Sequence, residues 1–166
     1  MKKTRRSFIR SSIFTGIGAS TLSFAQCGNP SDKNQSGIFT RLDHALNQPV
    51  LKRELFPDPV IIDSCDLLKY GGNYMVRVRS KDGAEGYCVG HNIRMPHLFP
   101  MQVSRVNPFF IGKDARDLDN LIMNDLMMYQ NNYKYQGYAL WIPVATAEIA
   151  ILDMLGRIAG KSIGEL

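Results

Sequence analysis

The sequence predicts an α+β fold in which a three-stranded antiparallel meander is followed by a helical bundle. Residues 74–80 alternate apolar and polar side chains, the pattern of a strand with one buried face. Turn signals flank this segment at Gly71-Gly72-Asn73 and at Lys81-Asp82-Gly83. From Asp114 onward the apolar residues recur at helical spacing instead. A chain of 166 residues is long enough for about one such domain.

The predicted meander has three strands, at residues 60–70, 74–80 and 85–89. In the second strand Val76 and Val78 share one side, and arginines occupy the other. We therefore expect one face of the sheet to be buried against the helices and the other to remain polar.

Two helical segments are predicted after the sheet. A short helix is expected over Met101–Val106 and is expected to end at Asn107-Pro108, because the residue before a proline disfavours the helical conformation. A longer segment begins with Asp114 as the N-cap and has Asp117 in capping-box position. Its apolar residues share one helical face: Leu118, Leu121, Ile122, Leu126 and Tyr129.

The last helix is predicted to start near Pro143, an acceptable first-turn residue, and to end at Gly160. Apolar residues surround nearly the whole of this helix, so it must be buried on more than one side. A three-stranded sheet covers one side only. We therefore expect that part of the packing partner is missing from this chain.

The net charge of +5 is concentrated at the N-terminus. The first acid is Asp32, and five basic residues precede position 26: Lys2, Lys3, Arg5, Arg6 and Arg10. Without these five, the 20 basic residues fall to 15 and equal the 15 acidic ones. The rest of the chain is neutral, so the basic pI does not predict a nucleic-acid partner.

Residues 1–25 resemble a bacterial twin-arginine export signal. The run from Thr4 to Arg10 contains the arginine pair Arg5 and Arg6 followed by Phe8. Small residues in Ser23-Phe24-Ala25 predict cleavage after Ala25. The intervening apolar stretch is too short to span a bilayer, which needs about 20 apolar residues. We therefore predict a periplasmic or otherwise exported protein.

Residues 26–59 are predicted to be a linker, with one short helix around Thr40 to Ala45, because glycine, proline and serine interrupt every regular pattern. Cys27 near the new N-terminus leaves lipoprotein anchoring as a less favoured alternative. A lipoprotein signal places a small residue before the acylated cysteine, whereas Gln26 stands there.

Three segments of the remaining chain contain distinctive motifs. In residues 76–87 a strand is followed by Asp-Gly and Glu-Gly-Tyr, the second segment is Phe110-Ile111-Gly112-Lys113-Asp114, and the third is the helix over 147–163. In this order and spacing they resemble the mandelate racemase/muconate lactonizing enzyme branch of the enolase superfamily. In that helix Asp153, Gly156 and Gly160 match the family's register. The resemblance covers roughly residues 60–166. Departures from the usual Trp, Lys and Pro occur at Leu152, Arg157 and Ser162.

This resemblance implies that residues 60–166 form the N-terminal capping domain of such an enzyme. In the family a modified (β/α)₈ barrel follows and carries the chemistry, in which a Lys or His base removes a proton next to a carboxylate and Mg²⁺ holds the ene-diolate. This chain contains no counterpart of that barrel, so no catalytic residue, metal ligand or cofactor is expected in it. Mg²⁺ is expected in the full-length parent, and this chain alone is expected to be inactive.

The resemblance also implies where the substrate is selected. The family's capping domain uses one loop between the first two strands and another after the third. Here these loops contain Tyr70, Asn73 and Tyr74, and then His91, Asn92 and Arg94. The parent is expected to be a dehydratase, racemase or cycloisomerase, with a hydroxy or sugar acid as substrate and the missing barrel as partner.

A second hypothesis is a non-enzymatic periplasmic module that binds a small acid or a partner protein. Such a module would have to cover its last helix by self-association. A metal site is not predicted, because Cys88, His91 and His97 lack the spacing of zinc ligands.

Overall fold

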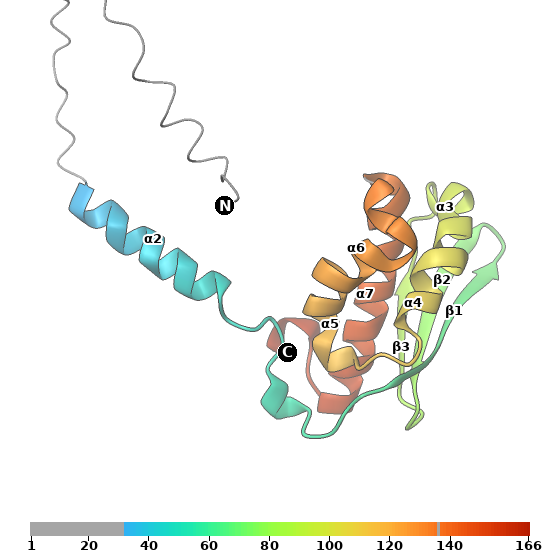
Figure 1. The fold of residues 1–166 in the computed structure, drawn as a ribbon. Helices are drawn as coiled ribbons and strands as arrows, with labels where there is room; N and C mark the ends of the chain where they lie inside the picture. Colours follow the sequence, from blue (N-terminus) through green and yellow to red (C-terminus); the bar gives the residue numbers. More distant parts are fainter. Residues whose placement is uncertain (1–31, 136) are drawn as a thin grey trace, which may run out of the picture. The chain divides into compact units, whose positions relative to one another are not determined.

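The computed structural model describes residues 32–135 and 137–166 (Figure 1). The predictions for the export signal at Arg5 and Arg6, for cleavage at Ala25 and for acylation of Cys27 lie outside these residues. The chain divides into two compact units, Met1–Asn47 and Gln48–Leu166. In the first unit helix α2 spans Asp32–Leu46 and is longer than the short helix expected around residues 40–45.

The second unit contains the predicted meander, so the α+β fold class is confirmed. Strands β1 (Ile62–Tyr70), β2 (Asn73–Ser80) and β3 (Glu85–Val89) form an antiparallel sheet in the order β1-β2-β3. Val76 and Val78 are fully buried on the face that packs against the helices, as their alternation predicts. The sheet therefore has one buried face.

The helical segment after β3 is longer than predicted. Helix α3 (Met95–Met101) continues through a π-helical turn at Gln102–Val106 into α4 (Asn107–Phe110). The expected end at Asn107-Pro108 is wrong. The N–H of Asn107 donates to the carbonyl of Gln102, five residues earlier, and this wider turn lets the backbone continue past a proline that has no N–H to donate.

The next segment begins at Asp114 as predicted. A 3₁₀ turn at Ala115–Asp117 leads into α5 (Leu118–Asn120), a π-helical turn and α6 (Leu126–Met128). Of the five residues expected on one face, Tyr129 is partly buried. The other four are buried in the core: Leu118, Leu121, Ile122 and Leu126. The carboxylate of Asp114 accepts the N–H of Arg116, whereas Asp117 forms an ion pair with Arg53.

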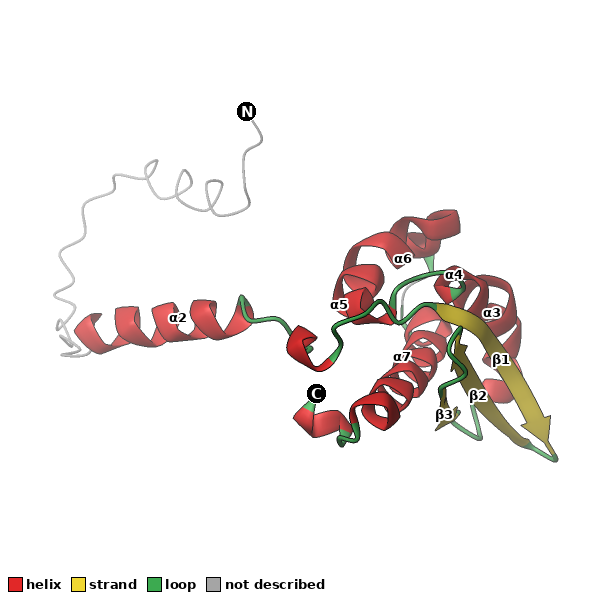
Figure 2. Ribbon diagram, turned by 90° about the horizontal axis from the view of Figure 1, so that it is seen from below, coloured by secondary structure: helices red, strands yellow, loops and turns green. Residues whose placement is uncertain are grey.

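The last helix, α7 (Tyr138–Ala159), starts earlier than predicted, so that Pro143 lies inside it. It ends at Gly160, whose φ of 63° is the left-handed conformation that favours glycine. Helix α7 packs against β2, β3 and α3 (Figure 2). It is long and apolar enough to cross a membrane, but 56% of its most apolar 18-residue stretch is buried inside the unit. Such burial is typical of a core helix.

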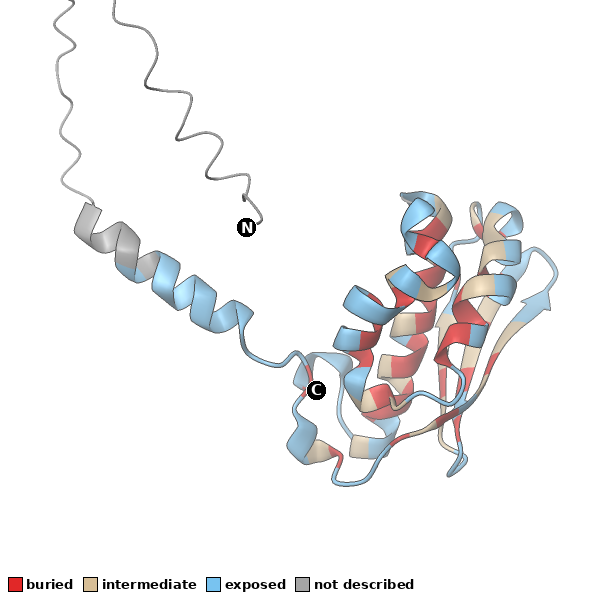
Figure 3. Cartoon of the chain, in the orientation of Figure 1, coloured by how far each residue is buried: buried red, intermediate tan, exposed pale blue. Residues whose placement is uncertain are grey.

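Elements of the same unit cover much of α7. The buried residues lie between the sheet and the helices (Figure 3). Large apolar side chains that stay exposed on α7 are Tyr138, Trp141, Ile149 and Ile158.

The compact unit starts at Gln48, before the expected domain boundary at Val60. Leu51 and Phe56, both within the expected linker, are buried members of the hydrophobic core. The N–H of Lys52 donates to the carbonyl of Leu166 at 2.7 Å. This segment is therefore part of the domain.

Candidate functional site

The two loops predicted to select a substrate meet at one end of the sheet. The first loop is the turn at Gly71-Gly72 between β1 and β2, and the second starts at Gly90 after β3. Met75 on β2 lies opposite Leu68 of β1 and Val89 of β3. Because β2 is the central strand, the end of β3 lies next to the turn between β1 and β2.

In the first loop Tyr70 and Asn73 are exposed, and Tyr70 is 89% exposed. Tyr74 is only 6% exposed. Its ring stacks on Phe99, with centroids 5.9 Å apart, and the Nζ of Lys69 lies 5.3 Å from its centroid. Tyr70 and Asn73 are therefore available to a ligand, whereas Tyr74 packs the loop onto α3.

In the second loop His91 and Asn92 are exposed. The carbonyl of His91 accepts the N–H of Met95 at 2.8 Å, which starts α3. The guanidinium carbon of Arg94 lies 4.0 Å from the ring centroid of Tyr138, at the start of α7. The sequence alone gives no sign of this contact, since no local pattern links two residues so far apart in the chain.

A shallow pocket of about 330 Å³ lies beside the first loop. It contains three of the predicted residues, Tyr70, Asn73 and Tyr74, and none from the second loop. The full lining is Leu68, Lys69, Tyr70, Asn73, Tyr74, Met75 and Val89. Because most of these side chains are apolar, the pocket suits an apolar group better than a charged one.

Ion pairs occupy the rest of the open face of the sheet. The Nη2 of Arg77 donates to Oδ2 of Asp66 at 3.0 Å, and Arg79 pairs with Glu85. Hydrogen bonds from Tyr87 and then from Arg79 lower the pKa of Glu85. These charges neutralise one another across the strands.

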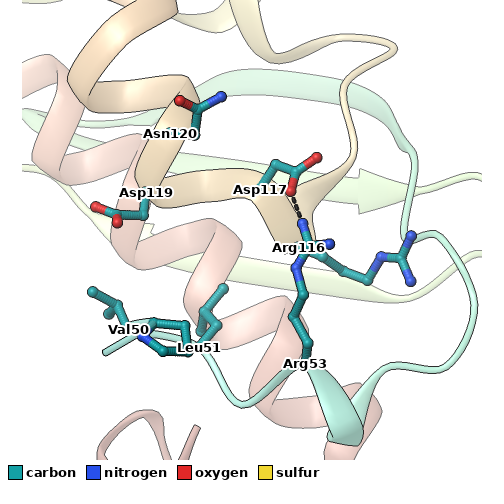
Figure 4. A pocket seen from close by; sticks show the side chains of 8 residues that line it. Val50, Leu51, Arg53, Arg116, Asp117, Asp119 and Asn120 are labelled. Carbon is teal, nitrogen blue, oxygen red and sulfur yellow. Dashed lines mark ion pairs between the residues drawn. The ribbon is translucent and has the colours of Figure 1, made fainter. Parts of the chain in front are cut away.

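A second pocket, of about 150 Å³, lies between the segment around Val50 and the start of α5 (Figure 4). Arg53 and Asp117 form an ion pair beside it. Arg116 turns instead toward Asp114. The basic groups of this small pocket are already paired, and we assign no ligand to it.

In residues 32–135 and 137–166 no three His, Cys, Asp or Glu side chains are grouped to hold a metal ion. These residues therefore do not fit a Mg²⁺ site. Cys65 and Cys88 are free thiols. Burial, with a smaller effect of Asp66, raises the pKa of Cys65 to about 12, so its thiol stays protonated and unreactive.

Known structures share the fold of this domain. The chain is similar to a mandelate racemase/muconate lactonizing protein from Paracoccus denitrificans, with 22% identity, a TM-score of 0.52 and coverage of 63% of this chain and 29% of that one. A protein from Roseobacter denitrificans provisionally described as a racemase gives 25% identity, a TM-score of 0.56 and coverage of 63% and 28%. A Paracoccus structure complexed with magnesium gives 21% identity, a TM-score of 0.50 and coverage of 63% and 29%.

The chain thus spans less than a third of the length of these proteins. No protein-family model matches the sequence, and no curated protein matches it either.

Proposed function

We propose that this chain carries the substrate-capping domain of an exported enzyme of the mandelate racemase/muconate lactonizing type. The observation that carries the proposal is the meeting of the two loops at one end of a sheet whose fold is shared with such proteins. The parent would be a Mg²⁺-dependent dehydratase, racemase or cycloisomerase of hydroxy or sugar acids. Its base and metal ligands would lie in the part of the neighbours' length that this chain does not span.

Within this proposal the exposed loop residues contact the substrate and the buried ones hold the loops. Tyr70, Asn73, His91 and Asn92 offer hydrogen-bonding groups at the loop end. Arg94 offers a charge that suits a carboxylate. Tyr74 fixes the first loop against α3 through its stack on Phe99.

The first test is the activity of the chain alone. We expect that incubation with Mg²⁺ and a panel of sugar acids in D₂O leaves the proton next to the carboxylate unexchanged, as followed by NMR. Removal of that proton needs a base and a bound metal ion, which we assign to the rest of the parent. Turnover by this chain would contradict the proposal.

The second test uses the genomic sequence downstream of Leu166. We expect an in-frame barrel with a Lys or His base and acidic metal ligands. In the longer protein His91→Ala should raise KM about tenfold for the sugar acid, whereas Asp82→Ala, in the turn at the opposite end of the sheet, should leave KM unchanged. Equal effects of the two substitutions would refute the loop assignment.

Export is tested separately. Replacement of Arg5 and Arg6 by lysine should retain the protein in the cytoplasm, because the twin-arginine pathway reads the arginine pair. A matched replacement of Lys2 and Lys3 by arginine should leave export intact. Periplasmic delivery of the Arg5/Arg6 variant would exclude this route.

A further inference from the structure

A third pocket, of about 390 Å³, lies at the end of the sheet opposite the two loops. The segment 55–60, the turn between β2 and β3 and the last turns of α7 meet at this end (Figure 1). These parts are distant in the sequence, so the fold alone creates the pocket. A volume of this size suits a small molecule that has an apolar body and a few polar groups.

The pocket combines apolar side chains with two carboxylates. Phe56 and Val60 are buried beside it, whereas Ile158 of α7 is 42% exposed. Asp58 and Asp82 are exposed and line the pocket from two different parts of the chain. Among the described residues that line it, none is Lys, Arg or His. The charge at the pocket is therefore negative at neutral pH.

Neither carboxylate is paired within the described part of the chain. Asp58 and Asp82 form no hydrogen bond and no ion pair there. The guanidinium of Arg116 attracts Asp58, but it forms its ion pair with Asp114. Lys81 precedes Asp82 in the turn and does not line the pocket. Both carboxylates are therefore open to an added cation.

The backbone around the pocket offers few hydrogen-bond donors. Pro57 and Pro59 have no N–H. The N–H groups of Phe56 and Val60 already donate to other parts of the domain. In the turn between β2 and β3, four N–H groups are also bonded within the domain: those of Ser80, Lys81, Gly83 and Ala84. A ligand whose polar groups are acceptors would therefore find few donors here.

A ligand that matches this pocket must bring donors, positive charge and apolar surface. A primary ammonium group, like that of lysine, has three donors and no acceptor. It can pair with both carboxylates, whereas a carboxylate or phosphate group would be repelled by them. An apolar body attached to the ammonium group would cover the exposed part of Ile158 and remove it from water.

We propose that this pocket binds a small organic amine, in which a primary ammonium group is attached to an apolar body. The ammonium group contacts Asp58 and Asp82, and the apolar body lies against Ile158. None of these residues belongs to the two loops, so the amine site does not depend on the proposed function.

The test is an NMR titration of the full chain with phenethylamine, followed at the backbone amide signals within residues 55–60 and 80–84. We expect these signals to shift with a Kd of about 1 mM, typical of one charged contact and a small apolar area. Phenethyl alcohol, which has the same apolar body without the charge, should bind about fivefold more weakly. Ethylamine, which lacks the ring, should bind about tenfold more weakly. Hydrocinnamate, an anion of similar size, should not bind.

Variants separate the charged contact from the apolar one. Asp58→Asn and Asp82→Asn should each raise the Kd about threefold to fivefold, whereas Asp125→Asn, at an exposed aspartate outside the pocket, should leave it unchanged. Ile158→Ser should raise the Kd about threefold or more. Ile149→Ser is the matched control, because Ile149 lies on the same helix with 45% exposure and does not line the pocket.

Three results would overturn the assignment of an amine to this pocket. They are equal Kd values for phenethylamine and phenethyl alcohol, equal losses of affinity in Asp58→Asn and Asp125→Asn, and shifts confined to residues outside 55–60 and 80–84. Circular dichroism of each variant shows whether it is folded, so that a loss of affinity in a folded variant is assigned to the side chain that was changed.

Discussion

At the scale of single residues, Gly86 sets how closely the sheet approaches α7. A Cβ placed at Gly86 would lie 2.1 Å from the carbonyl oxygen of Ala150 and 2.3 Å from the N of Met154. Both are backbone atoms of a buried helix and cannot turn aside. Next to this contact the N–H of Tyr87 donates to Oδ2 of Asp153 at 2.9 Å, which fastens the edge of β3 to the same helix.

Gly86→Ala should therefore destabilise the domain by about 3 kcal/mol or more, because β3 and α7 must move apart to admit the methyl group. Urea denaturation of the two proteins measures the difference in the free energy of unfolding. Gly72→Ala is the matched control, since a Cβ at Gly72 meets nothing within 4 Å, and it should change that free energy by less than about 1 kcal/mol. Equal losses of unfolding free energy in the two variants would show that the close approach of β3 to α7 is not the reason for a glycine at position 86.

Glu148 is a second residue that affects the stability of the domain, through the pKa of its carboxyl group. Burial, and then the charge of Asp119, raise the pKa of the Glu148 carboxyl. A pKa raised in the folded state contributes stability below the ordinary glutamate pKa, and this contribution is lost as the pH rises through the folded-state value.

Glu148→Gln, which cannot ionise, should therefore be more stable than the parent at about pH 7, and the difference should disappear toward about pH 3.5. Thermal unfolding at a series of pH values measures this. Glu54→Gln, at an exposed glutamate, is the matched control for the removal of a carboxylate. A Glu148→Gln variant that is less stable at neutral pH would mean that the carboxylate has a favourable partner.

At the scale of elements, Asp114 links the start of β1 to the helical layer. Its Oδ1 accepts the N–H of Val60 and the N–H of Arg116, each at 3.1 Å. The guanidinium of Arg116 pairs with the same carboxylate and also donates to the carbonyl of Phe56 at 3.1 Å. Burial raises the pKa of Asp114, but these hydrogen bonds outweigh burial and hold it below the ordinary value.

Asp114→Ala should lower the free energy of unfolding by about 1–3 kcal/mol at neutral pH, because two backbone N–H groups lose their acceptor. The loss should shrink in acid as the pH falls through the folded-state pKa of Asp114, where the parent also loses its carboxylate. Asp117→Ala removes an exposed ion pair with Arg53 and should cost less than about 1 kcal/mol. Comparable losses of unfolding free energy in the two variants would show that Asp114 does not link β1 to the helical layer.

At the scale of the whole molecule, the domain depends on a segment that looks like a linker in the sequence. Phe56 is 2% exposed, and Leu51 is 6% exposed. Between them the N–H of Lys52 bonds to the carbonyl of Leu166, so the two ends of the compact unit are joined.

A protein comprising residues 48–166 should therefore unfold cooperatively with nearly the same free energy as the full chain, whereas 60–166 should be largely unfolded. Loss of the buried Phe56 side chain alone is worth about 3–5 kcal/mol, a large share of a domain's stability. Urea denaturation followed by circular dichroism measures both proteins. Equal stability of the two would place the domain boundary at Val60 after all.

Local sequence patterns predicted an element correctly where the residues of that element alone decide its conformation. The alternation around Val76 and Val78 predicted β2, and the turn signals on each side predicted its neighbours. Asp114 and Gly160 marked helix ends because capping and the left-handed conformation depend on the residue itself. The loop residues of the candidate site came from the family resemblance. The meander explains only why the two loops meet, since consecutive antiparallel strands return alternate connections to the same end of the sheet.

The sequence by itself thus determined the meander, the helix boundaries at Asp114 and Gly160 and the concentration of charge in the first residues. Only the tertiary structure decided that the helix continues past Pro108, that Leu51 and Phe56 enter the core and that Arg94 meets Tyr138. Each of these depends on contacts between residues distant in the chain, where burial or a wider helical turn outweighs the local preference of proline or of a polar segment. Local periodicity contains no information about such contacts.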